Sequence, residues 1–206
     1  MSARLRRTLL AAVLLLAQSG TADAHIVSAR LGDFYAGALH PLLTLQDVLT
    51  WAALGLLAGS LGAASGRWLV LVFPLGLCIG LALAARTGLA PMSPLVDALS
   101  ILVLGLLLAS ALRIPVMLMC VIALAIGLMR GVVNAGELTP QTDHVLYAAG
   151  LAAAGYVVIT LVMALTLTFR RPETAPISTW RGIAVRAVGG WVAAIGLMMA
   201  GLSLAA

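Results

Sequence analysis

Long apolar stretches separated by short polar breaks dominate this chain. Six of them approach the roughly 20 residues that a helix needs to cross a bilayer. They cover Leu45–Ala64, Trp68–Ala85, Leu95–Leu112, Pro115–Val133, His144–Phe169 and Gly182–Leu204. The breaks between them are Ser65–Arg67, Arg86–Pro94, Arg113–Pro115, Asn134–Asp143 and Arg170–Arg181. The pattern predicts an all-α integral membrane protein with six transmembrane helices in one compact bundle. Because the third break is so short, we expect the third and fourth helices to form a tight hairpin.

A shorter apolar stretch precedes these runs and has the layout of an export signal. Arg4, Arg6 and Arg7 are followed by apolar residues from Leu9 to Ala17 and by the small-x-small pattern Ala22-Asp23-Ala24. This stretch is too short to span a membrane, and its layout is typical of a secretory signal peptide. We therefore expect a cleavable signal peptide over residues 1–24 and a single transmembrane domain over 25–206.

Cleavage after Ala24 would make His25 the first residue of the mature chain. A free amine beside an imidazole offers two neutral nitrogen donors, which suit Cu(II) and Ni(II). The alternative is that His25 merely follows the cleavage site.

Composition supports the membrane assignment and narrows the partners. The chain is 63% hydrophobic and 9% charged, with a mean hydropathy of +1.13, outside the usual range of soluble domains. Its net charge of +5 comes entirely from arginines near the ends of the apolar runs, without interleaved aromatic residues. We therefore expect the lipid bilayer as a partner and no nucleic acid. The sequence leaves open whether the chain forms a homo-oligomer.

The arginines also indicate an orientation. With the exported N-terminus outside, most of the arginines of the mature chain fall on the inner side, as the positive-inside rule requires. They are Arg67, Arg113, Arg170, Arg171, Arg181 and Arg186, against Arg30, Arg86 and Arg130 outside. The expected location is the bacterial inner membrane, crossed several times, with the mature N-terminus in the periplasm.

Acids and histidines gather on the opposite, outer side. They are His25, Asp33, His40, Asp47, Asp97, Glu137, Asp143 and His144. Asp143 and His144 form either a helix-start pair or part of a ligand set, and Asp97 suits a helix start, where a carboxylate meets unpaired N–H groups.

Two polar stripes stand out on this side. His40, Thr44, Asp47 and Trp51 share one helical face by spacing,, and Arg130, Asn134 and Glu137 form a second stripe. Ionisable groups within a membrane are costly unless paired or hydrated, so they are functional candidates. Arg130 would repel a metal ion and could pair with Asp47 or Glu137 as a structural clasp. A modified metal or ion path, and a contact for lipid or a partner, are the alternatives.

These positions resemble two motifs of the HupE/UreJ family of hydrogenase/urease accessory membrane proteins. The first motif, HPxxGxDHxxxM, falls on residues 40–51, where His40 and Pro41 match and Thr44, Gln46, Asp47 and Trp51 differ. The second, HGxAHGxE, falls on residues 130–137. Gly131 and Glu137 match there, while Arg130 and Asn134 replace both histidines.

The resemblance implies a permease for nickel or cobalt. In that reading His25 and His40 capture the ion, Asp47 and Glu137 hold it, and Gln46 and Asn134 supply neutral oxygens. The metal would be a transported solute, and no cofactor is expected. Hydrogenase, urease or another membrane complex would be a partner.

Two other functions remain open at this point. One is a non-transporting membrane subunit, in which Arg130 serves as the clasp. The other is a channel for urea or ammonia, in which Thr44, Gln46 and Asn134 supply hydrogen bonds. We do not expect an enzyme, because the sequence contains no phosphate-binding loop, nucleophile elbow or HExxH pair,.

Overall fold

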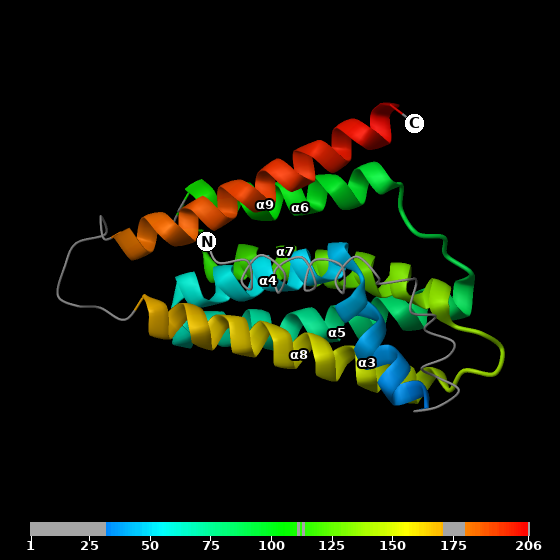
Figure 1. Cartoon of the computed structure of the whole chain (residues 1–206). Coiled ribbons are helices and arrows are strands. Elements are labelled where there is room, and N and C mark those ends of the chain that lie inside the picture. The colour runs from blue at the N-terminus through cyan, green and yellow to red at the C-terminus, as the bar shows by residue number, and fades with distance from the viewer. Residues whose placement is uncertain (1–31, 111, 113, 171–179, 206) are drawn as a thin grey trace, which may run out of the picture.

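The six helices that the apolar runs predict are present, and one further helix precedes them. The computed structural model describes residues 32–110, 112, 114–170 and 180–205, and within these ranges every regular element is helical (Figure 1). The elements are α3 (Asp33–Leu43), α4 (Leu45–Leu61), α5 (Ala63–Thr87), α6 (Pro94–Ser110), α7 (Val116–Asn134), the 3₁₀ turn η1 (Ala135–Glu137), α8 (His144–Phe169) and α9 (Trp180–Ala205). The expected signal peptide, His25, Arg30, Arg113, Arg171 and Glu173 lie outside the described residues.

Length and composition identify four of these helices as candidate membrane spans. They are α5, α7, α8 and α9, and the bent pair of α3 and α4 makes a fifth if it counts as one span. The remaining helix, α6, is apolar but shorter, with 17 residues. The chain is thus a multi-pass membrane protein by these criteria.

Side-chain burial has the distribution expected in a bilayer. Trp51, Phe73, Leu77 and Ile159 are fully buried, and the Trp51 and Phe73 rings meet edge to face at 6.0 Å. Many large apolar side chains nevertheless face outward on the long helices. Examples are Leu71, Leu165, Val121, Trp191 and Leu202. Such a surface suits contact with lipid.

The helices pack in a group and a pair. In the group, α5 lies along α7, while α3 and α4 both lie against α8; in the pair, α6 lies along α9 (Figure 1). Contacts of α4 with α6 join the pair to the group. The expected hairpin of the third and fourth helices is therefore wrong, because α6 and α7 each pack along a different helix.

Close backbone approach at glycines explains this choice of partners. A Cβ at Gly80 of α5 would collide with the backbone of Leu128 in α7, and one at Gly105 of α6 would collide with Ala193 in α9. Small residues are the main means by which helices associate in lipid. Gly55 and Gly59 are packing positions of the same kind against α8, and Gly76 and Gly80 are packing positions against α7.

The break between the first two predicted helices lies earlier than expected. Gly62, with φ +87°, separates α4 from α5, whereas Ser65, Gly66 and Arg67 belong to α5. A positive φ strains residues with a side chain, so glycine permits the turn. Gly66 instead packs tightly against the carbonyl of Ala58. Gly66 therefore serves the close packing of α5 on α4. The sequence pattern alone predicted a loop at this position.

A sharp bend separates α3 from α4. Thr44 is extended, with φ −96° and ψ 115°, and the two helix axes differ by 83°. Pro41 lies in the last turn of α3 and lacks a backbone donor, which weakens the helix there. Gly37 and Gly150 bring α3 and α8 into backbone contact, at the Tyr147 and Phe34 carbonyls respectively. This contact holds α3 across α8.

Candidate functional site

Polar side chains from four helices meet at one end of the molecule. There α4, α6 and α8 begin and α7 ends, which is the right-hand end in Figure 1. We call it the acidic end, defined by Asp47, Asp97, Glu137 and Asp143. Each of these acids lies in, or directly beside, the first or last turn of a helix, so the fold gathers charges that are far apart in the sequence.

Arg130 is the centre of this cluster. Its Nε donates to Asp47 Oδ1 at 2.7 Å, and the two side chains are only 3% and 1% exposed. Its terminal NH1 donates to Asp97 Oδ2 at 3.3 Å. One guanidinium therefore links α4, α6 and α7. These contacts also tie the α6–α9 pair to the rest of the protein.

Asn134, one turn after Arg130, completes the buried part of the site. Its Nδ2 donates to the Arg130 carbonyl oxygen at 2.9 Å and reaches Asp47 Oδ2 at 3.4 Å. Both oxygens of Asp47 thus have donors from α7. Such donors offset the cost of burying a carboxyl group within an apolar helix bundle.

A second, more accessible pair lies beside the cluster. His40 Nδ1 is 3.8 Å from Glu137 Oε2, and the two side chains are 22% and 36% exposed. The bend at Thr44 places His40 on α3, while Glu137 belongs to the turn η1 after α7. His40 therefore does not share a helix with Asp47 and Trp51, and the expectation of one continuous stripe is wrong.

Several buried polar atoms around this site have no hydrogen-bond partner among the described residues. They are Asp97 Oδ1, Asn134 Oδ1, Trp51 Nε1 and the Tyr147 hydroxyl. Trp51 lies one turn beyond Asp47 on α4, and Asn134 is bonded to Asp47. Buried polar atoms usually have partners. These atoms could therefore bind a hydrated or polar solute.

The other predicted residues surround this centre in different ways. Asp143 caps α8 by accepting from the backbone N–H groups of Val145 and Leu146, at 2.9 and 3.0 Å, as expected for a helix start. His144 is exposed at the first position of that helix. The Thr44 hydroxyl donates to the His40 carbonyl at 3.2 Å, and Gln46 is half-buried.

The buried cluster contains two carboxyl groups and one guanidinium. Arg130 carries a single positive charge and contacts two carboxyl groups, so it can neutralise only one carboxylate,. Within the described ranges, however, no three His, Cys, Asp or Glu side chains lie close enough together to hold a metal ion. The part of the chain that the structure describes thus offers oxygen acceptors and carboxyl groups without a ready-made metal cage.

The predicted clasp is confirmed for one partner. Arg130 pairs with Asp47, whereas Glu137 faces His40 instead. Sequence reasoning missed Asp97, which it assigned to the start of a helix only. The sequence does show Asp97 as an acid at the outer end of an apolar run. Nothing in the residue spacing, however, linked Asp97 to Arg130.

Comparison with known proteins gives one match. The family model described as HupE / UreJ protein matches residues 12–199, which is most of the chain. No curated protein and no solved structure gives a significant match. The positions at which this chain departs from the family's histidine motifs include Asp47, Arg130 and Asn134, which contact one another.

Proposed function

The chain belongs to the HupE/UreJ family, and on that premise we propose that it is a membrane permease for a divalent transition-metal ion such as nickel or cobalt. The observation that carries this proposal is the set of buried acceptor oxygens around Arg130. Two carboxyl groups share one guanidinium, and Asp97 Oδ1 and Asn134 Oδ1 are buried acceptors without a partner. A cation would occupy these oxygens.

Capture of the ion is assigned to the accessible pair. The imidazole of His40 and the carboxylate of Glu137 are 3.8 Å apart and reach solvent, and both groups are ligands that nickel and cobalt accept. His25, as the first mature residue, would add nitrogen donors. Asp143 and His144 lie at the same end and add polar groups around the capture site.

Passage beyond the capture site requires competition with Arg130. The ion takes over Asp47 and Asp97 from the guanidinium, with Gln46, Thr44 and Asn134 supplying neutral oxygens. Arg130 repels a cation until the ion shares the carboxylates of Asp47 and Asp97 with it. Arg130 therefore acts as a barrier that the incoming ion must displace. Charged side chains within membranes commonly mark such ion routes.

The membrane topology is part of the proposal. We assign six spans, formed by α4 to α9, with α3 lying across the outer end. Residues 1–24 form a cleavable signal peptide, and the mature N-terminus is periplasmic in the inner membrane. The excess of arginine at the opposite end of the molecule supports this orientation.

The Arg130 contacts also favour a second function. A buried arginine that binds two carboxyl groups from neighbouring helices can serve as a fixed clasp. In that case the chain is a non-transporting accessory subunit for hydrogenase, urease or another membrane complex. A channel for urea or ammonia has less support, because Asn134 and Thr44 already donate within the protein.

Uptake by purified protein tests the proposed function. Proteoliposomes that contain a metal-sensitive dye would receive Ni²⁺ or Co²⁺ under a negative-inside potential. We expect faster uptake than in empty liposomes, loss of this uptake in His40→Ala and Glu137→Gln, and retention in Gln141→Ala, an exposed polar control at the same end. A folded wild-type protein without uptake would contradict the permease and favour the accessory subunit.

A further inference from the structure

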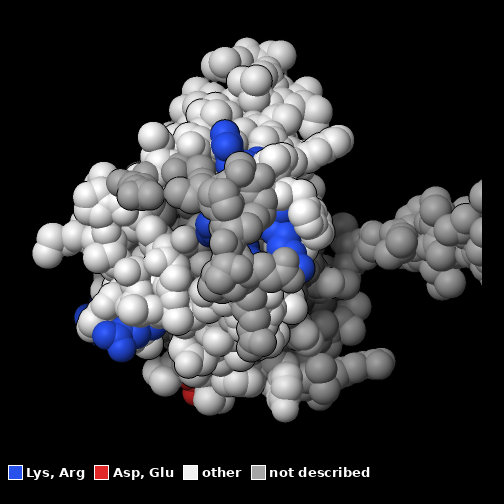
Figure 2. All heavy atoms as spheres, turned by 90° about the vertical axis from the view of Figure 1, so that its left-hand side faces the viewer, with Lys and Arg blue, Asp and Glu red and all other residues white. Residues whose placement is uncertain are grey.

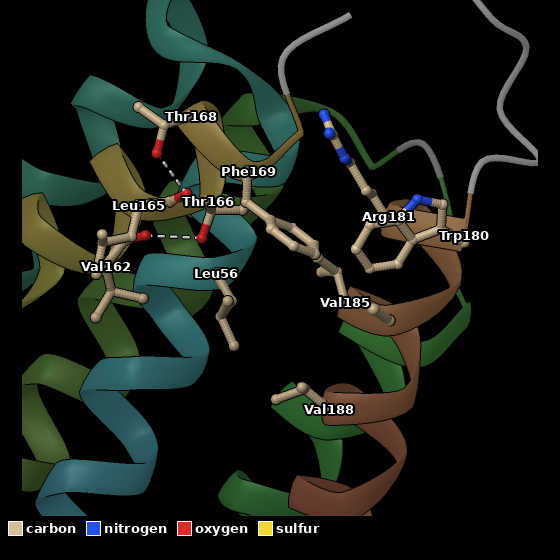
Figure 3. A pocket seen from close by; sticks show the side chains of 11 residues that line it. Leu56, Val162, Leu165, Thr166, Thr168, Phe169, Trp180, Arg181, Val185 and Val188 are labelled. Atoms are coloured by element: carbon tan, nitrogen blue, oxygen red, sulfur yellow. Dashed lines mark hydrogen bonds between the residues drawn. The ribbon is translucent and has the colours of Figure 1, made fainter. Parts of the chain in front are cut away.

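A cavity opens between helices at the end of the molecule opposite the acidic end. Its volume is about 730 Å³, and its lining is contributed by α4, α8 and α9. Leu56, Val162, Leu165, Phe169, Val185 and Val188 supply most of the lining, which is apolar. Figure 3 shows Leu56 and Val188 pointing into this space from opposite sides.

The cavity exists because two consecutive helices separate. Although α8 and α9 follow each other in the chain, α8 packs on α3, α4 and α5, whereas α9 packs on α6. The rings of Phe169 and Trp180 bridge the two helices at the mouth, with centroids 5.5 Å apart (Figure 3). Leu165 and Val188 remain exposed within the cavity. In a bilayer, hydrocarbon is the natural occupant of such a space.

One arginine lines the mouth of the cavity, and a second directly follows a lining residue in the chain. Arg181 lines it directly and stacks on Trp180 at 5.7 Å, and Arg170 follows the lining residue Phe169. Figure 2 shows that arginine side chains predominate over acidic ones on this face of the molecule. Tryptophan and arginine together are typical of the headgroup level of a membrane.

The dimensions and the charge indicate an amphipathic ligand. Val188 lies seven residues beyond Arg181 on α9, which places it about 10 Å deeper along the helix axis. A ligand that fits has an anionic group at the mouth and an apolar chain running inward. Guanidinium groups bind phosphate through several N–H donors, and within the described residues Arg170 donates one hydrogen bond, from Nη1 to the Ser60 carbonyl at 3.1 Å.

We propose that this cavity is a binding site for an anionic phospholipid, with one acyl chain between α8 and α9 and the phosphate at Arg181 and Arg170. Basic pockets between transmembrane helices bind acidic headgroups in this way. The lipid fills the space between α8 and α9, which meet at Phe169 and Trp180, and so it stabilises the α6–α9 pair against the rest of the protein. The site is separate from the acidic end and does not depend on metal transport.

Thermal unfolding of the purified, metal-free protein in detergent tests the site. Phosphatidylglycerol should raise the unfolding midpoint more than phosphatidylcholine with the same acyl chains. Arg181→Gln should weaken the phosphatidylglycerol effect about five-fold in apparent affinity. Val188→Phe, which fills the cavity, should remove the response to either lipid. Arg67→Gln, an exposed arginine on α5 that does not line the cavity, should respond like the wild type.

Several results would overturn this assignment. Equal shifts with the two lipids would exclude recognition of the headgroup, and an equal loss in Arg67→Gln would show diffuse charge attraction only. A full shift with glycerol phosphate would mean that free phosphate suffices and that no acyl chain is bound. Formation of a dimer that Val188→Phe disrupts would identify a second copy of the chain as the occupant. Circular dichroism of each variant before heating verifies that it is folded.

Discussion

Arg130 makes this chain different from a membrane protein with a histidine-lined ion site. It stands where the family pattern has histidine, and its neighbours Asp47 and Asn134 also differ from the motif. The three substitutions are mutually compatible, because the positive charge of Arg130 is bonded to an acid that the motif would not supply. In this chain these three positions form a hydrogen-bonded ion pair rather than a set of imidazoles.

Removal of Arg130 should strongly destabilise the protein. Arg130→Ala leaves Asp47 buried without its partner, and breaking a buried pair costs roughly 3–5 kcal/mol. Asp47→Asn added to Arg130→Ala should cost little more, because the charge that needed a partner is gone. Unfolding in detergent of the two single variants and the double variant gives the coupling, and Arg67→Ala serves as the exposed control. Strictly additive losses would contradict the clasp.

Histidines at positions 130 and 134 should raise the affinity for metal. The double variant Arg130→His and Asn134→His removes the repelling charge and places two imidazoles beside Asp47 and Asp97. We expect tighter Ni²⁺ binding than in the wild type, measured by calorimetry. The double variant Arg130→Gln and Asn134→Gln removes the positive charge without adding imidazole ligands. It therefore controls for the effect of losing the charge alone. Equal affinity in these two double variants would argue against the proposed location of the ion.

The residues of this site could be predicted only in part. The charge of Arg130 among outer acids predicted a pair with Asp47 or Glu137, and the pair with Asp47 is present. Asp97 could not be linked to Arg130, because their contact depends on how α6 packs against α4. The residue spacing within a single helix does not show which helix it packs against. The assignments of His25 and of the full ligand set remain predictions.

At the level of elements, the bend between α3 and α4 shapes the acidic end. Hydrophobic periodicity predicted the long helices well, and the fifth apolar run matches α8 from His144 to Phe169. It failed at Thr44, because residue spacing assumes a continuous helix. The direction of α3 is decided by its contact with α8, so His40 approaches Glu137 rather than Asp47.

A side chain at Gly37 should disrupt this arrangement. The Cβ of Gly37→Ala would collide with the Tyr147 carbonyl and push α3 away from α8. We expect a lower unfolding midpoint and weaker metal binding, because His40 moves with α3. Gly190→Ala in α9 is the matched control, since a Cβ there meets open space and alanine favours a helix,. Wild-type stability in Gly37→Ala would contradict the packing of α3 on α8.

At the level of the whole molecule, the two ends have opposite character. Acids and the His40–Glu137 pair occupy one end, and arginines lie beside the lipid cavity at the other. Counting arginines in the sequence predicted this polarity. The division into an α6–α9 pair and a larger group was not predictable, because it depends on which glycine faces meet in three dimensions.

Cysteine labelling tests the orientation of the molecule. In a background with Cys78→Ala and Cys120→Ala, Gln141→Cys lies at the acidic end and Ser110→Cys at the opposite end; both positions are exposed. A membrane-impermeant thiol reagent applied to spheroplasts should modify Gln141→Cys at once. Ser110→Cys should react only after the membrane is permeabilised. The reverse pattern would place the acidic end in the cytoplasm and would contradict capture from the periplasm.

The most direct test of the central claim is a calorimetric titration of the purified mature protein with Ni²⁺ and Co²⁺. Recognition of the ion at the acidic end predicts saturable binding that is lost in His40→Ala and in Glu137→Gln and kept in Gln141→Ala. Absence of binding to the folded wild type, or binding that disappears only in His25→Ala, would contradict it.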